Sequence, residues 1–219
     1  MNEPGIRAPD WQRPAIPQCI VNGRVIAIGR GLPRADVLAV ARALRDAGIH
    51  AFEVTLNRPE ALDQIADLTA AFDPDELLVG AGTILDAGAG AQAVAAGARF
   101  LVSPHTDTRL VEWAASRGLP AFPGAFTPTE IHAAWRAGAA AVKLFPASAV
   151  GPTFVREFRG PFGDIPLVPT GGITLETAAA YIRAGALAVG VGGWLTASGD
   201  PIVVRDRAAA LVAAVGAAG

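Results

Sequence analysis

The sequence is poor in cysteine, histidine and charge. A single cysteine, Cys19, rules out a disulfide within the chain and predicts a reducing, cytoplasmic setting. Only 17% of residues are charged, the net charge is −2, and no block of basic residues occurs. This composition argues against a nucleic-acid groove and against binding to an anionic membrane. No apolar run reaches the ~18 residues of a membrane span. The three histidines are scattered, without metal-ligand spacing, so we expect no metal site.

Apolar residues, by contrast, are abundant and make up 52% of the chain. A length of 219 residues suits one domain with a large core, and an α/β barrel falls within this range. Residues 1–14 lack the apolar core of a signal peptide and are interpreted as an N-terminal arm or short helix. No interdomain linker is visible, so we expect a single domain over residues 15–219.

One pattern recurs along the chain: a helical stretch, a glycine and then a short apolar run. Glycine just past a helix is the favoured left-handed cap, and the apolar run after it is typical of a buried strand. The pattern occurs at Gly48, Gly97, Gly118, Gly138 and Gly185. A repeated strand–helix–glycine–strand unit requires parallel strands with crossover helices.

Counting the apolar runs predicts eight strands. They fall near 25–29, 51–56, 77–82, 99–103, 121–123, 141–145, 167–169 and 188–192, and the final helix is expected over 208–219. Eight parallel units in one domain favour a closed (β/α)8 TIM barrel, with an open doubly wound sheet as the alternative.

Two charged residues interrupt apolar runs. Lys143 lies within the expected sixth strand and Glu53 within the second. Burial disfavours the charged form of an ammonium, and a lysine with a lowered pKa is a nucleophile towards carbonyls. A desolvated carboxyl has a raised pKa, which suits proton transfer near neutral pH. Lys143 and Glu53 are therefore the candidate catalytic residues.

Other candidates follow from position, because active sites of such barrels lie at the carboxyl ends of the strands. Arg30 could contact Glu53 or a substrate carboxylate, since its planar fork suits carboxylates. The further substrate-binding candidates at strand ends are Thr83, Pro104, Phe145 and Thr170.

Two glycine pairs follow the expected seventh and eighth strands. They are Gly171 with Gly172, and Gly192 with Gly193. The loops after these two strands are the usual phosphate site of the barrel, where glycines let backbone N–H groups approach the oxygens. We expect phosphate binding there.

A series of short motifs runs along the chain in this order: Glu53-Val54-Thr55-Leu56, Val79-Gly80-Ala81-Gly82-Thr83, Val102-Ser103-Pro104, Pro123-Gly124, Thr127-Pro128-Thr129-Glu130, Val142-Lys143-Leu144-Phe145-Pro146, Pro169-Thr170-Gly171-Gly172 and Gly192-Gly193-Trp194-Leu195. Taken together, these motifs resemble the 2-dehydro-3-deoxy-6-phosphogluconate aldolase / 4-hydroxy-2-oxoglutarate aldolase family over roughly residues 15–215. The chain departs from some members at Asn57, where they carry Arg, and at Gly193, where they carry Ser.

The resemblance implies a class I aldolase, a lyase, in which Lys143 forms a Schiff base and Glu53 shuttles protons. It implies that Thr83, Pro104 and Phe145 shape a pyruvate pocket. The implied reaction is reversible cleavage of 2-keto-3-deoxy-6-phosphogluconate to pyruvate and glyceraldehyde 3-phosphate by a homotrimer. No metal or organic cofactor is expected, because the protonated imine serves as the electron sink.

Several alternatives stay open. The same chemistry could act on 2-keto-3-deoxy-6-phosphogalactonate or on 4-hydroxy-2-oxoglutarate. A non-covalent, phosphate-binding barrel isomerase would use Lys143 only to stabilise an enolate. A non-catalytic trimeric scaffold would use neither charged residue.

Overall fold

The computed structural model describes residues 12–218 of the chain, so most of the expected arm over residues 1–14 lies outside the described residues. The strands are β1 (Val25–Gly29), β2 (Ala51–Thr55), β3 (Leu78–Gly82), β4 (Leu101–Val102), β5 (Ala121–Phe122), β6 (Gly124–Ala125), β7 (Val142–Leu144), β8 (Leu167–Pro169) and β9 (Val189–Val191). Each expected strand is present, although several are shorter than the sequence pattern indicated.

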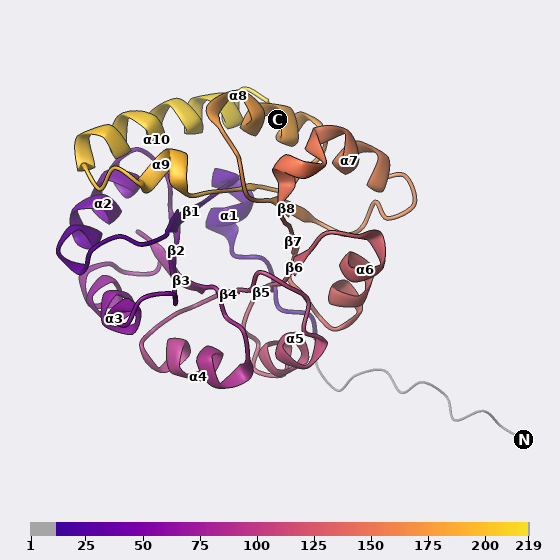
Figure 1. Ribbon diagram of the computed structural model, residues 1–219, viewed down its shortest axis with the longest axis horizontal. Coiled ribbons are helices and arrows are strands. Elements are labelled where there is room, and N and C mark those ends of the chain that lie inside the picture. The colour runs from indigo at the N-terminus through magenta and orange to yellow at the C-terminus, as the bar shows by residue number, and fades with distance from the viewer. Residues whose placement is uncertain (1–11, 219) are drawn as a thin grey trace, which may run out of the picture.

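A helix follows each of these strands except β5, which leads directly into β6. The helices are α1 (Gln18–Gly23), α2 (Arg34–Asp46), α3 (Ala61–Ala71), α4 (Ala87–Ala95), α5 (Thr108–Ala115), α6 (Pro128–Arg136), the 3₁₀ turn η1 (Ala147–Ala149), α7 (Gly151–Phe158), α8 (Leu175–Arg183), α9 (Gly193–Thr196) and α10 (Pro201–Gly216). Figure 1 shows α2 to α8 and α10 arranged around the strands.

Besides these shorter strands, one strand is divided and one helix begins earlier than the sequence predicts. The run expected as one strand at 121–123 is divided into β5 and β6 by Pro123, which has no N–H to donate to a ladder. The last helix begins at Pro201 rather than at residue 208. Its start is fixed by the Asp200 side chain, which accepts a hydrogen bond from the Ile202 amide, with proline in the first turn.

All strand pairs are parallel. One sheet has the order β5-β4-β3-β2-β1-β9, and a second has the order β6-β7-β8. The Lys143 amide donates to the Pro123 carbonyl, and a parallel bridge joins Thr170, just after β8, to Gly190 in β9. Backbone contacts therefore link the two sheets at both of their edges.

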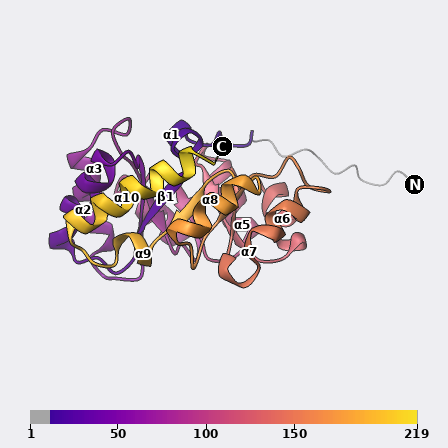
Figure 2. The ribbon, with the colours of Figure 1, turned by 90° about the horizontal axis from the view of Figure 1, so that it is seen from above.

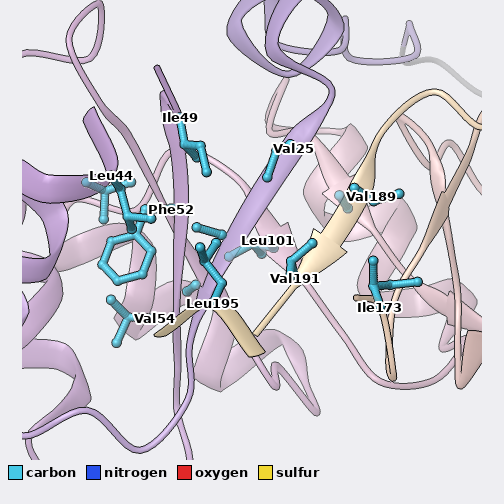
Figure 3. Close-up of a cluster of buried hydrophobic side chains, with 14 of the residues drawn as sticks. Val25, Leu44, Ile49, Phe52, Val54, Leu101, Ile173, Val189, Val191 and Leu195 are labelled. Atoms are coloured by element: carbon cyan, nitrogen blue, oxygen red, sulfur yellow. The ribbon is translucent and has the colours of Figure 1, made fainter. Parts of the chain in front are cut away.

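Apolar residues pack on both faces of the strands. One cluster lies between the strands and the surrounding helices and includes Phe52, Leu44 and Leu195 (Figure 3). A smaller cluster occupies the opposite strand face and includes Ile26, Phe100 and, from α1, Ile20; an edge-to-face contact joins the rings of Phe100 and Phe122. Because side chains alternate along a strand, this second face is the one that also carries Glu53 and Lys143.

The two ends of the strands are covered differently. Helix α1 precedes the amino end of β1, whereas α9 follows the carboxyl end of β9, and Figure 2 shows them on opposite sides of the molecule. Within residues 12–218, no helix has both the length and the apolar character needed to cross a membrane.

Candidate active site

The two buried charges occupy the middle of their strands. Glu53 in β2 pairs in register with Ile28 on one side and Gly80 on the other. Lys143 in β7 pairs with Gly124 and Val168. Gly82 in β3 makes room for the Glu53 carboxylate, because a Cβ at that position would lie 2.6 Å from Glu53 Oε1. The space beside the register partners Gly80 and Gly124 is filled instead by the Phe100 ring and the Pro104 backbone.

Glu53 and Lys143 line one small cavity. Its volume is about 10 Å³, close to the space that one water molecule needs. The remaining walls are almost entirely apolar: Ile26, Ile28, Val102, Phe122, Val168, Thr170 and Gly190. Only 2% of Glu53 and 4% of Lys143 is exposed. Both groups are thus removed from bulk water in the same place.

Burial in this cavity shifts the pKa values of both Glu53 and Lys143. Desolvation lowers the pKa of Lys143 below the usual 10.5, against the opposing attraction of Glu53; the positive charge of Arg30 lowers it further. Desolvation raises the pKa of Glu53, opposed by the positive charges of Lys143 and Arg30. Burial therefore shifts both groups towards their uncharged forms, a free amine and a protonated carboxyl group.

Phe145 and Thr170 lie between the charged pair and a wider cavity. The Lys143 ammonium lies 5.1 Å from the centroid of the Phe145 ring. Thr170, which is 5% exposed, lines both the small cavity and a wider one that opens beyond it. A substrate that extends outward from Lys143 would therefore pass these two side chains.

The wider cavity has a volume of about 350 Å³ and gathers most of the other predicted residues. It is lined by Ile28, Arg30, Phe145, Thr170, Gly171, Gly172, Ile173, Thr174, Gly190, Gly192, Gly193 and Trp194. Gly171 and Gly172 have φ angles of +93° and +72°, a region that glycine adopts readily. A side chain at Gly172 would lie 2.6 Å from the Ser148 Cβ, so glycine is required there on two counts.

Thr83 and Pro104 lie beside this assembly rather than in it. Neither lines either cavity. Thr83 follows Gly82, against which the Glu53 carboxylate packs, and has an unusual φ of +60° for a residue with a side chain. The Pro104 backbone lies over Gly124, the register partner of Lys143. Both residues therefore lie next to glycines that flank Glu53 or Lys143.

Some site features were missed by the sequence reasoning. Ile28 and Gly190 line both cavities, and their apolar character gave no functional signal. The parallel register could have found Ile28, since it pairs with Glu53. A second signal lay in the composition, because Lys143 is the only lysine among 18 basic residues.

The chain is similar over most of its length to proteins of one known family. Residues 16–209 match the family described as KDPG and KHG aldolase. The chain is 36% identical to a probable 2-dehydro-3-deoxy-6-phosphogalactonate aldolase of Rhizobium meliloti (strain 1021), over 87% of this chain and 90% of that protein. It is 38% identical to a 2-dehydro-3-deoxy-phosphogluconate aldolase of Pseudomonas aeruginosa PAO1, over 84% and 80% respectively.

A solved structure is also similar. The KDPG aldolase of Legionella pneumophila, with pyruvate captured as a covalent carbinolamine, has a TM-score of 0.77 and 28% identity to this chain, and covers 92% of this chain and 96% of its own. Fold and site together define an α/β lyase of the aldolase class. This chain belongs to the KDPG and KHG aldolase family.

Proposed function

We propose that the protein cleaves 2-keto-3-deoxy-6-phosphogluconate reversibly to pyruvate and glyceraldehyde 3-phosphate through a Schiff base on Lys143. One observation carries this proposal: the only lysine of the chain is buried beside Glu53, and its cavity adjoins a wider, glycine-lined one. Family membership supports the same chemistry.

The first step needs an uncharged amine. Lys143 Nζ attacks the C2 carbonyl carbon and forms a carbinolamine, which loses water to give a protonated imine. The lowered pKa of Lys143 increases the fraction of free amine that is available for this attack. Glu53, whose raised pKa lets it hold or release a proton, transfers protons to and from the carbinolamine oxygen.

Carbon–carbon cleavage follows from the imine. Removal of the C4 hydroxyl proton sends the electrons of the C3–C4 bond into the imine, which leaves an enamine on Lys143 and releases glyceraldehyde 3-phosphate. Glu53 takes that proton and returns one to C3 of the enamine. Hydrolysis of the resulting imine releases pyruvate and restores the amine, so the cycle consumes no cofactor.

The remaining predicted residues take positions along the substrate. Arg30, on the rim of the wider cavity, pairs with the substrate carboxylate, and Thr83, Pro104, Phe145 and Thr170 shape the passage around C1 to C4. Backbone N–H groups of Gly171, Gly172, Gly192 and Gly193 receive the phosphate. These roles are supported by the shared cavity of about 350 Å³ for all but Thr83 and Pro104.

A second substrate has a specific argument in its favour. The relatives at 36% and 38% identity are named for the galactonate and the gluconate compound respectively. The two substrates differ only in the configuration at C4, and both can form the same imine at C2 and break the same C3–C4 bond. We therefore include 2-keto-3-deoxy-6-phosphogalactonate, while 4-hydroxy-2-oxoglutarate remains a third candidate with the same covalent step.

Trapping the covalent intermediate tests the proposal. Borohydride reduction in the presence of pyruvate is expected to add one reduced pyruvate, and peptide mass spectrometry is expected to find it on Lys143. Because the chain has no other lysine, the N-terminal amine is the only competing primary amine. An unmodified Lys143 would favour a non-covalent isomerase or a scaffold instead.

We also propose that the two sheets form one closed (β/α)8 barrel over residues 15–219, and that the chain is a cytoplasmic homotrimer. The bridge from Thr170 to Gly190 and the bond from the Lys143 amide to Pro123 support closure. Amide exchange protection at both seams checks closure, and light scattering at three times the chain mass checks the trimer. The single cysteine supports a cytoplasmic location.

A further inference from the structure

A separate cavity of about 630 Å³ lies at the opposite end of the strands from Lys143. Its walls include the residues just before four strands, namely Arg24 before β1, Ala140 before β7, Pro166 before β8 and Leu187 before β9. Helix α1 borders the same end, away from α9 and the glycine-lined cavity (Figure 2). This amino-end cavity shares no lining residue with either of the two cavities of the active site.

Positive charge predominates in the amino-end cavity. Its charged lining residues are Arg13, Arg24 and Arg159, opposed by Asp164, so three positive charges and one negative leave a net charge of +2. Elsewhere arginines pair with carboxylates, as Arg34 does with Asp63 and Asp67. Within residues 12–218, none of the three cavity arginines forms an ion pair.

Two of these arginines are held in place by neutral partners. The Arg13 guanidinium lies 3.3 Å from the centroid of the Trp135 ring and donates to the Ala139 carbonyl. Arg159 Nη1 donates to the Gly185 carbonyl at 2.8 Å. Each guanidinium has five N–H donors, so most of them remain available after one such bond. The fold therefore orients these side chains without neutralising them.

Desolvation makes the unmatched charge more costly. Burial lowers the pKa of Arg13. Arg24 ends α1 with a left-handed φ of +56°, a conformation that residues with a side chain seldom adopt. An anion bound in the cavity would form charge-assisted hydrogen bonds with guanidinium groups that line it, and such bonds are stronger than neutral ones.

We propose that the amino-end cavity is a second ligand site and that it binds a phosphate monoester. A phosphate monoester carries about −1.5 to −2 charge at pH 7, which matches the net +2 of the lining. Arginine forks suit phosphate oxygens. The apolar walls, which include Ile16, Val21 and Ile165, accommodate the organic part. The volume falls within the ~300–1,000 Å³ of small-molecule sites.

Tryptophan resonances can separate this site from the active site. Of the four tryptophans, Trp135 lines the amino-end cavity and Trp194 lines the glycine-lined cavity. The experiment titrates the full chain, labelled with ¹⁵N at the indole nitrogens, with phenyl phosphate at constant ionic strength. We expect the Trp135 resonance to shift saturably, with a dissociation constant different from that reported by Trp194.

Variants of the cavity arginines test which side chains bind the phosphate monoester. The double variant Arg24→Asn/Arg159→Gln is expected to weaken the Trp135 titration about 100-fold or more, on the scale of two charge-assisted hydrogen bonds. The dissociation constant reported by Trp194 should stay unchanged, and this result would also show that the variant is folded. Arg156→Gln is the matched control, since Arg156 lies on α7 outside the cavity and pairs with Glu157.

A variant that removes a negative charge, and should therefore strengthen binding, tests the proposal even if the double variant fails to fold. Among residues 12–218, Asp164 is the one lining residue with a negative charge, so Asp164→Asn should tighten binding severalfold. The proposal is overturned if the Trp135 resonance does not saturate, if it follows Trp194 in every titration, or if Asp164→Asn leaves its dissociation constant unchanged.

Discussion

The two cavities at the carboxyl ends of the strands are built by opposite means. The inner one holds two charged side chains, Lys143 and Glu53, within about 10 Å³ of space among apolar walls. The outer one has about 350 Å³, and four of its lining positions are the glycines of the predicted phosphate site. The inner cavity is characterised by its buried charged side chains, and the outer cavity by its glycines, which have no side chain.

This difference separates reactivity from binding. In the inner cavity, desolvation shifts the pKa values of both charged groups, so the protein environment sets the chemistry. In the outer cavity, backbone N–H groups can approach a ligand only because no Cβ stands in the way. Changes in the inner cavity should therefore affect kcat, whereas changes in the outer cavity should affect KM for phosphorylated substrates.

The largest effect is expected from removing the nucleophile. Lys143→Met keeps an unbranched side chain of similar length in the apolar wall but cannot form an imine. We expect activity to fall roughly 10⁶-fold, the scale observed when a covalent nucleophile is removed. Steady-state assays with pyruvate detection measure this loss, and thermal unfolding serves as the control for folding. Activity within tenfold of the wild type would exclude the Schiff base.

A smaller loss is expected at the proton-transfer group. Glu53→Gln is nearly isosteric and should lower kcat by about 10²–10⁴-fold, the usual contribution of general acid–base catalysis. The reduced pyruvate adduct on Lys143 should still form, only more slowly. Wild-type turnover in Glu53→Gln would remove this carboxyl from the mechanism.

The outer cavity is tested by adding one methyl group. Gly172→Ala places a Cβ 2.6 Å from the Ser148 Cβ at a φ of +72°. We expect KM for the phosphorylated substrate to rise about 10- to 100-fold, the scale of one charge-assisted hydrogen bond, with a smaller change in kcat.

Gly118→Ala is the matched control for backbone strain. Gly118 has a similar φ of +65°, but its added Cβ would meet nothing within 4 Å. This variant should lose some stability and keep its KM. Equal kinetics for the two variants would show that the outer cavity does not bind the phosphate.

The smallest effect is a shift of the pH profile. The positive charge of Arg30 lowers the pKa of Lys143, so Arg30→Gln should raise that pKa. Because kcat/KM follows the fraction of free amine, its rise with pH should move to higher pH in the variant. Arg30→Lys should restore the wild-type midpoint, since it restores the charge. A midpoint that moves to lower pH in Arg30→Gln would contradict this assignment.

Much of this arrangement could be predicted from local sequence. Apolar runs preceded by glycine caps identified the strands, and charges within two of those runs identified Lys143 and Glu53. The short helix α9 and the start of α10 at Pro201 were not predicted, because the glycine-rich and polar residues around them resemble loop sequence.

Other features could not be read from the sequence because they depend on distant contacts. Ile28 becomes part of the site only when β1 pairs with β2 and β9, and its side chain has no chemistry of its own. The amino-end cavity brings Arg13, Arg24 and Arg159 together from widely separated positions. No local pattern marks such a cluster.

The protonation state of the Lys143 amine is the most direct test of the proposed mechanism. Because Lys143 is the only lysine, labelling the chain with ¹³Cε-lysine gives a single side-chain resonance that can be followed from pH 5 to 11 by NMR. We predict that its titration midpoint lies below the 10.5 of an ordinary lysine and that pyruvate replaces the resonance with that of an adduct. A midpoint at or above 10.5, with no change on adding pyruvate, would contradict the account.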